Sequence, residues 1–262
     1  MAVYGRYDTM FQALLNRFVP GSPPFIGTRH RETGACRDAS PPRWFLFFAC
    51  RYGPCHFPRH VLCTLDVAEE NPFPAGKWVN VFDGKSLEGW KSANFGGEAE
   101  VKVSDGSIII EPGSPLTGIT YTGDGLPKTS YEVELEAQKQ QGIDFFCALT
   151  FPVGDESCTF VVGGWAGSVV GLSSIDGKDA SRNDTTQYMT FKKDQWYKIK
   201  VRVTPGHIEA WIDGKPVAKQ ALEGHKLSIR PEVELNRPLG ICTFETRAAL
   251  RNMKIRRLKE TK

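Results

Sequence analysis

A single carboxylate opens a predicted strand and is the first candidate for chemistry. In the stretch "GIDFFCALTF" (142–151), Asp144 stands before seven residues of which six are apolar. A second apolar run, "CTFVVGGW", follows the turn residues "PVGDES", so the two runs predict a β-hairpin. If Phe151 pairs with Cys158 in this hairpin, strand alternation places Asp144 opposite Trp165.

The same register predicts the surroundings of Asp144. One face of the hairpin carries large apolar side chains, and the other carries Asp144, Phe146 and Trp165 among small residues. Aromatic rings stack on pyranoses and carboxylates accept hydrogen bonds from hydroxyls, so we expect a sugar platform with Asp144 as the catalytic or hydroxyl-binding acid. The alternative is that a loop covers both rings and Asp144 caps a turn. Cys147 and Cys158 share the core face but lie diagonally apart, which predicts buried thiols rather than a disulfide.

An oxygen-rich loop, "SSIDGKDASRNDTT", follows the hairpin. Asp176 and Asp179 are residues of the type that ligates Ca²⁺, and Arg182 and Asn183 are suited to sugar hydroxyls at a rim. Loops of this composition are also common as solvated turns. The sequence therefore establishes no cofactor, and it leaves a divalent metal such as Ca²⁺ as a hypothesis. In a regular meander Asp176 lies about 23 Å along the strand from Asp144, so these two residues do not form a catalytic pair in that register.

Three glutamates share one face of another predicted strand. Alternation in "YEVELEA" places Glu132, Glu134 and Glu136 on one side, while the residues between them enter the core. Retaining β-glucanases have a similar acidic strand, with catalytic carboxyls about 5–5.5 Å apart. Those enzymes usually carry an Asp between the glutamates and a longer signature, which this sequence lacks. A solvated outer strand is the favoured interpretation, and an endo-glucanase is an alternative function.

The elements that position these residues are strands. From Lys77 onward, short β-rich runs are separated by Gly, Asp, Asn and Pro turns, several of which contain an Asp-Gly step. Asp-Gly between such runs is a strong hairpin signal, and no amphipathic helix of useful length interrupts them. Roughly a dozen strands at this spacing predict an all-β fold, a two-sheet antiparallel β-sandwich.

Residues 1–76 differ in composition from the rest of the chain. They hold eight arginines and no lysine, nine of the 17 prolines and four of the seven cysteines. This shift predicts a low-order leader at 1–76 and a sandwich domain at 77–262. The run "RWFLFFACRYGPC" is similar to an export signal, although Arg51 cuts it short. A plain leader is the favoured interpretation of this segment, and a mis-started or degenerate export signal is the alternative. We expect a periplasmic or extracellular location, or a cytoplasmic one if the leader is not a signal.

Composition also excludes some partners. A net charge of +3 over 262 residues gives no strong field, so nucleic acid is not an expected partner. No apolar run approaches the roughly 18–20 residues of a membrane span. The oligomeric state is not predicted.

The opening of the folded part carries a recognisable signature. The stretch "KWVNVFDGKSLEGWK" (77–91) resembles the N-terminal signature of the 3-keto-disaccharide hydrolase family, also described as 3-keto-glucoside lyase/hydratase domains. The matching residues are Phe82, Asp83, Gly84, Lys85, Leu87, Gly89 and Trp90. Later stretches in the expected order, "VSDG", "SYEVELEA" and "QWYKIKVRV", extend the resemblance over about residues 77–259.

The resemblance implies a concanavalin-like jelly roll that cleaves glycosides already oxidised at C3. A C3 ketone acidifies the C2 hydrogen, so a base removes it and the glycosidic oxygen is expelled. This chemistry needs a base, a metal or cation that stabilises the enolate, and an acid for the leaving group. The implied partner is a carbohydrate or oxidised glycoside, and the alternative is a non-catalytic lectin-like module. The family's Asn-Ser-Gly strand is replaced here by "GIDFFCALTF", so its catalytic residues are not carried over.

Overall fold

The computed structural model of the protein describes residues 71–259. The predicted leader and its export-like run lie outside the described residues, so both stay predictions. No helix within 71–259 is long and apolar enough to cross a membrane.

One of the two sheets, sheet A, has the order β13-β12-β11-β6-β15-β4-β3, and β1 pairs with β15 beside this path. Its pairings are antiparallel. Its strands are β1 (Trp78–Asn80), β3 (Val101–Ser104), β4 (Ser107–Ile110), β6 (Tyr131–Gln141), β11 (Trp196–Val203), β12 (His207–Ile212), β13 (Lys215–Ala221) and β15 (Arg247–Arg257).

The other sheet, sheet B, is also antiparallel and has the order β10-β9-β8-β7-β14-β5-β2. Its strands are β2 (Trp90–Ser92), β5 (Leu116–Tyr121), β7 (Cys147–Val153), β8 (Glu156–Gly163), β9 (Val169–Ser173), β10 (Gln187–Tyr188) and β14 (Gly240–Phe244). Two short segments accompany this sheet, the tight turn α2 (Gly164–Gly167) between β8 and β9 and the 3₁₀ helix η1 (Pro231–Asn236) before β14.

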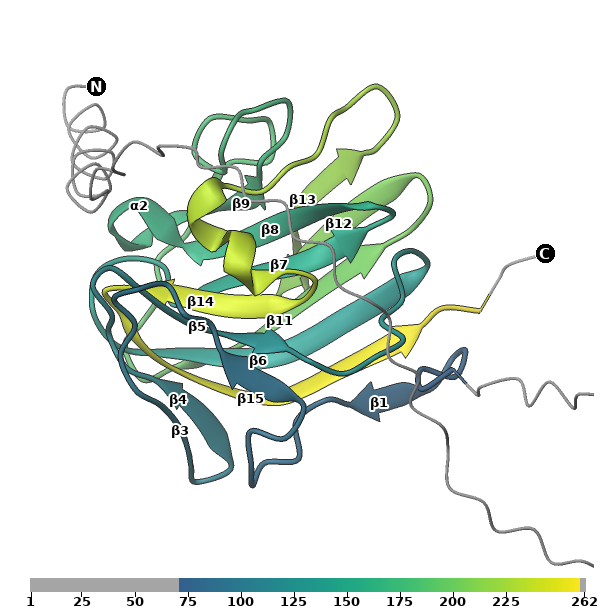
Figure 1. The fold of residues 1–262 in the computed structure, drawn as a ribbon. Coiled ribbons are helices and arrows are strands. Elements are labelled where there is room, and N and C mark those ends of the chain that lie inside the picture. The colour runs from purple at the N-terminus through teal and green to yellow at the C-terminus, as the bar shows by residue number, and fades with distance from the viewer. Residues whose placement is uncertain (1–70, 260–262) are drawn as a thin grey trace, which may run out of the picture. The chain divides into compact units, whose positions relative to one another are not determined.

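The two sheets form the predicted all-β antiparallel sandwich (Figure 1). Alternate residues of each strand enter the layer between the sheets, as in β6, where Val133, Leu135 and Ala137 are buried. The predicted hairpin register is confirmed, because Phe151 of β7 pairs with Cys158 of β8. Both hairpin cysteines are buried free thiols, also as predicted.

The outer face of sheet B is covered by segments of the same chain. A Cβ added at Gly171 in β9 would lie 3.0 Å from the Ala180 carbonyl oxygen, because the loop 174–186 crosses this strand. At Gly240 in β14 the corresponding atom would lie 2.7 Å from the Asn236 carbonyl oxygen at the end of η1. Only glycine allows these close approaches, so the small residues predicted for this face serve to seat a loop and η1.

Candidate functional site

Asp144 lies in the loop between β6 and β7 and holds the turn α2. Its Oδ1 accepts a hydrogen bond from its neighbour's backbone, Phe145 N–H, at 2.8 Å, and its Oδ2 accepts one from Ala166 N–H at 3.0 Å. Trp165 and Ala166 have φ values of 48° and 65°, in the left-handed region that non-glycine residues rarely adopt. Asp144 and Trp165 thus lie close together, beyond the paired ends of β7 and β8, with the carboxylate held by the backbone of the turn.

The pKa of Asp144 is shifted in a different direction from those of the other shifted carboxyl groups in residues 71–259. Burial raises the pKa of Asp144 above its ordinary value, and the negative charge of Glu245 adds to this effect. Hydrogen bonds from the backbone N–H groups of Ala166, Phe145 and Trp165 act in the opposite direction without cancelling the rise. Among the carboxyl groups of residues 71–259 whose pKa is shifted, Asp144 alone is shifted upward. A raised pKa favours the protonated carboxyl group, which is the form that a general acid needs.

Two charged residues near Asp144 or the turn α2 were not found by sequence reasoning. Glu245 is exposed at the corner between β14 and β15, and the next residue, Thr246, accepts a hydrogen bond from Asp144 N–H at 3.3 Å. Lys139 of β6 reaches the same turn, since a Cβ added at Gly167 would lie 3.6 Å from its Nζ. We call Lys139, Asp144, Trp165 and Glu245 the Asp144 cluster. It combines two carboxyl groups, an ammonium group and an indole at one end of sheet B.

Phe146 lies elsewhere than expected. Its side chain is 0% exposed and packs in the core against Phe191 and Tyr197, with ring centroids 5.1 and 6.0 Å away. The expected exposed platform at Phe146 is therefore absent. The strand β7 begins at Cys147, so its alternation does not extend back to this position. Trp165 remains half-buried beside Asp144.

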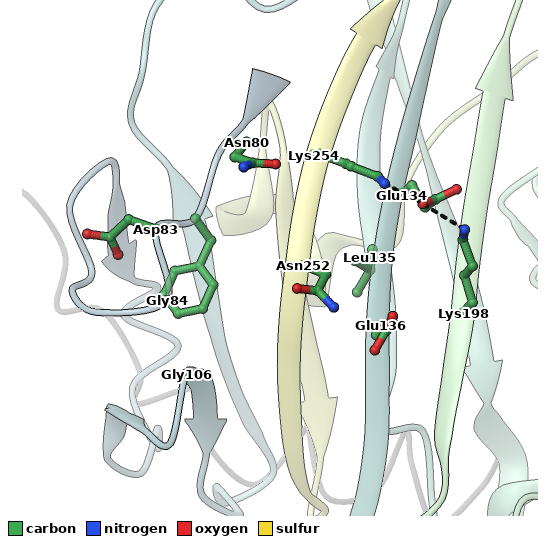
Figure 2. Close-up of a pocket in the computed structure, with 11 residues that line it drawn as sticks. Asn80, Asp83, Gly84, Gly106, Glu134, Leu135, Glu136, Lys198, Asn252 and Lys254 are labelled. Atoms are coloured by element: carbon green, nitrogen blue, oxygen red, sulfur yellow. Dashed lines mark ion pairs between the residues drawn. The ribbon is translucent and has the colours of Figure 1, made fainter. Parts of the chain in front are cut away.

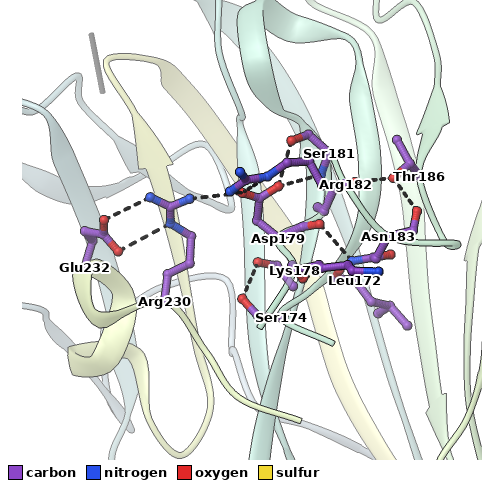
Figure 3. Close-up of polar contacts among 12 residues, drawn as sticks. Leu172, Ser174, Lys178, Asp179, Ser181, Arg182, Asn183, Thr186, Arg230 and Glu232 are labelled. Atoms are coloured by element: carbon purple, nitrogen blue, oxygen red, sulfur yellow. Dashed lines mark hydrogen bonds and ion pairs between the residues drawn. The ribbon is translucent and has the colours of Figure 1, made fainter. Parts of the chain in front are cut away.

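The loop 174–186 forms a separate polar cluster (Figure 3). Asp179 is 3% exposed, and its Oδ2 lies 2.6 Å from Arg182 Nη2 and 3.5 Å from Arg230 Nη1. Arg230 also pairs with Glu232 at 3.0 Å. Burial opposes ionisation of Asp179, but hydrogen bonds from Arg182 and Ser181 outweigh it and hold the pKa below its ordinary value.

Asn183 stabilises the same loop from within. Its Nδ2 donates to the carbonyl oxygens of Leu172 and Asp179, each at 2.8 Å. Its Oδ1 accepts from the backbone N–H and the hydroxyl of Thr185 at 2.9 and 2.6 Å. Both ends of the amide are occupied, so Asn183 fixes the loop rather than pointing to Asp144.

The expected metal pair is not assembled in the described part of the chain. Asp176 accepts hydrogen bonds from Lys226 N–H at 2.8 Å and contacts His225 Nδ1 at 2.7 Å, apart from the arginine partners of Asp179. No group of three or more His, Cys, Asp or Glu side chains converges anywhere in residues 71–259. Ca²⁺ takes six to eight oxygen ligands, so the surroundings of Asp176 and Asp179 do not fit this ion.

Two of the three glutamates of β6 lie between cations of both neighbouring strands, and the third, Glu136, pairs with Arg251 of β15. Glu132 is 0% exposed between Arg202 and Arg256, while Lys198 and Lys254 lie 3.0 and 2.9 Å from Glu134 Oε1. Burial opposes ionisation of both glutamates, but hydrogen bonds from these cations outweigh it and hold the pKa of each below its ordinary value. A retaining glucanase needs one carboxyl with a raised pKa, and neither of these two acids supplies it.

The side chains of the signature stretch 77–91 hydrogen bond to the backbone of the same stretch. Trp90 Nε1 donates to the Val81 carbonyl oxygen at 2.6 Å, and Asp83 Oδ1 accepts from Lys85 N–H and Ser86 N–H at 2.8 and 2.9 Å. These bonds close the loop between β1 and β2, which explains the spacing of Asp83 and Trp90 in the signature.

The sequence model of 3-keto-alpha-glucoside-1,2-lyase-like domains matches residues 77–256. The chain belongs to this family. The resemblance predicted from "FDGKSLEGW" is thereby confirmed, and the 3-keto-glucoside lyase-like domain is a carbohydrate-active domain. No curated protein sequence matches it.

Several solved structures resemble this lyase-like domain. An endo-acting O-glycanase of the human gut microbiota has a TM-score of 0.45 and 13% identity, covering 71% of this chain and 100% of that chain. Domain 4 of the extracellular arabinanase AbnA from Geobacillus stearothermophilus, in complex with arabinotriose, has a TM-score of 0.42 and 13% identity over 66% of this chain and 84% of that one. The carbohydrate-binding module CBM66 from Bacillus subtilis has a TM-score of 0.40 and 11% identity over 64% and 95%.

Proposed function

We propose that the protein cleaves glycosides oxidised at C3, by elimination followed by hydration, and that the Asp144 cluster performs this reaction. The observation that carries the proposal is the position of the Asp144 carboxyl group, which is held 3.0 Å from Ala166 N–H on the turn that carries Trp165, where burial and the nearby Glu245 raise its pKa. Family membership supplies the substrate class, because the family is named for lyase chemistry on 3-keto-α-glucosides.

Each residue of the cluster has a role in this proposal. The Glu245 carboxylate takes the C2 proton, and the resulting enolate oxygen at C3 is stabilised by the Lys139 ammonium group. The enolate electrons then form a C1–C2 double bond as the C1–O bond breaks, and the departing oxygen takes the proton of Asp144. Water adds to C1, gives one proton to Asp144, and Glu245 returns its proton to C2. The net reaction consumes one water, and Trp165 supplies a ring face for the sugar.

A binding module without turnover is the second candidate, and one observation favours it. Both carboxylate oxygens of Asp144 accept backbone N–H groups, which is sufficient to explain the residue as a cap for the turn α2. A carboxylate has about four lone-pair sites, so these two bonds leave room for a sugar hydroxyl in either candidate function.

The experiment incubates the full-length protein with 3-keto-trehalose and 3-keto-glucosides, with and without chelator, and follows released sugar by mass spectrometry. We expect release by the wild type that falls by 10² or more in Asp144→Asn, the usual size of a general-acid contribution. Asp155→Asn is the matched control, since this side chain is 97% exposed in the turn between β7 and β8. Binding of these sugars without any release by the wild type would establish the binding module instead.

A further inference from the structure

A polar cavity lies on sheet A, away from the Asp144 cluster. It has a volume of about 320 Å³, and its floor is the outer face of β6, β11 and β15 (Figure 2). The signature loop at 82–84 and the turn at Gly106 form its wall. Small-molecule pockets begin at about 300 Å³, so this volume suits one or two sugar rings.

Two amide side chains at the cavity have no partner in the described chain. Asn80 ends β1, and Asn252 lies in β15 at a φ of 54°, where the pairing of β15 with β6 shifts register. Both are exposed, and within residues 71–259 neither side-chain amide hydrogen bonds to another residue. Each amide therefore offers one acceptor and two donor hydrogens to a ligand, which matches the donor and acceptor character of sugar hydroxyls.

The charges around the cavity favour a neutral ligand. Glu134 is paired with Lys198 and Lys254, and Glu136 is paired with Arg251 at 2.7 Å. With the Asp83 carboxylate of the wall, three acids face three cations around the cavity, so the charges compensate one another and leave little net field for a polyanion. Carboxylates and ammonium groups in this arrangement still exchange hydrogen bonds with hydroxyl groups.

Aromatic stacking contributes little at this cavity. The Trp78 ring near its edge already has the Arg256 guanidinium 4.5 Å and the Lys254 ammonium 4.9 Å from its centroid. A ligand here is therefore held mainly by hydrogen bonds, and we expect weaker binding than at a site with an open indole.

The cavity is distinct from the Asp144 cluster. Glu136 of the cavity lies three residues before Lys139 of the cluster, and strand alternation places these two side chains on opposite faces of β6. Glu136 shares the outer face with Glu134, whereas Lys139 extends to Gly167 in the turn α2. We propose that this sheet A cavity is a second saccharide-binding site, specific for a neutral hexose unit and independent of the reaction proposed for Asp144.

The test is calorimetric titration of the full-length protein with maltose, cellobiose and trehalose. We expect at least one to bind, and the dissociation constant to rise at least tenfold in the double variant Asn80→Ala with Asn252→Gly. Glycine removes the amide at position 252 while tolerating the positive φ. Asn94→Ala, at another exposed asparagine, should bind like the wild type.

Three results would overturn this site. The first is no binding of any of the three disaccharides by the wild type. The second is unchanged affinity in the double variant, and the third is loss of binding in Asp144→Asn alone, which would move the sugar to the Asp144 cluster. Thermal melts of each variant confirm that the fold is retained, and an unaltered rate on 3-keto-trehalose in the double variant separates this site from the proposed reaction.

Discussion

Replacing Glu132 by Gln tests how the centre of sheet A is held together. The Glu132 carboxylate is 0% exposed, and Oε1 lies 2.8 Å from Arg202 Nε and 2.7 Å from Arg202 Nη2. The other oxygen accepts hydrogen bonds from Arg256, one of them from Nε at 3.1 Å. Glutamine removes the negative charge and turns an NH₂ group toward a guanidinium, so two cations lose their compensation.

The size of the effect follows from the exposure of the partners. Removing one member of a fully buried ion pair costs about 3–5 kcal/mol. The side chains of Arg202 and Arg256 are 35% and 32% exposed, so water recovers part of this cost. We therefore expect the free energy of unfolding to fall by about 2–3 kcal/mol. For a domain of this size that corresponds to a melting temperature lower by roughly 4–12 °C.

The effect has a defined dependence on pH. The pKa of Glu132 in the folded protein lies below its ordinary value of 4.5, so the folded state holds this proton less tightly than the unfolded chain. The stability that Glu132 contributes is therefore fully present above pH 4.5 and is lost as the pH falls through the pKa of the folded state. The difference between wild type and Glu132→Gln should be constant near pH 7 and should shrink toward pH 3.

The assay is urea unfolding followed by tryptophan fluorescence at a series of pH values. Glu156→Gln is the matched control, because Glu156 is exposed at the start of β8 and should change stability by less than about 0.5 kcal/mol. A loss below about 0.5 kcal/mol in Glu132→Gln, or a loss that stays the same from pH 7 to pH 3, would refute the reasoning.

Three further predictions follow from the buried groups and the Asp144 cluster. Phe146→Ala should lower the unfolding free energy by about 3–5 kcal/mol in calorimetry. Ile143→Ala is the control and should not, because the Ile143 side chain is 70% exposed. A smaller effect at Phe146 than at Ile143 would contradict the core position of Phe146. Burial raises the pKa of Cys158 and of Cys242 to about 12, so peptide mapping after thiol labelling at pH 8 should find both unlabelled in the native protein and labelled after unfolding. Native labelling at either position would count against the structure. Lys139→Met should reduce kcat/KM on 3-keto-trehalose by about 10²–10³. Lys128→Met, at an exposed lysine, should not. Equal kcat/KM values for the two variants would show that Lys139 takes no part in the reaction.

Much of the fold was accessible from local patterns. Alternation in β7 and β8 fixed the pairing of Phe151 with Cys158, because a slip by one residue would exchange the core and outer faces. The Asp-Gly steps at Asp105 and Asp213 predicted the tight turns of the β3–β4 and β12–β13 hairpins. These features depend on residues close in sequence, which is why one sequence was enough to predict them.

The features that were missed depend on sheet order. Glu132 appeared to lie on a solvated strand, yet β11 and β15 flank β6 and bring Arg202 and Arg256 to it from 70 and 124 residues away. Glu245 reaches Asp144 in the same way, through the neighbouring corner of β14 and β15. The alternation of residues within one strand does not predict contacts between strands that are far apart in the sequence.

The loop 174–186 was ambiguous for a different reason. Oxygen-rich residues such as Asp179 serve equally well for a metal or for a network with arginine, and the composition of the loop does not separate the two. In the structure Asp179 pairs with Arg182 of the same loop at 2.6 Å, and Arg230, which lies far along the chain, adds a second guanidinium 3.5 Å away. Phe146 was misplaced because regular pairing of β7 starts one residue later, at Cys147.

The most direct test of the proposed reaction compares two leaving groups in Asp144→Asn. An alkoxide such as that of a methyl 3-keto-glucoside needs a proton as it departs, whereas a 4-nitrophenolate does not. We expect kcat/KM of the variant to fall by about 10²–10³ on the methyl glycoside and by less than tenfold on the nitrophenyl glycoside. Equal losses on both substrates, or no loss on either, would contradict the assignment of Asp144 as the proton donor.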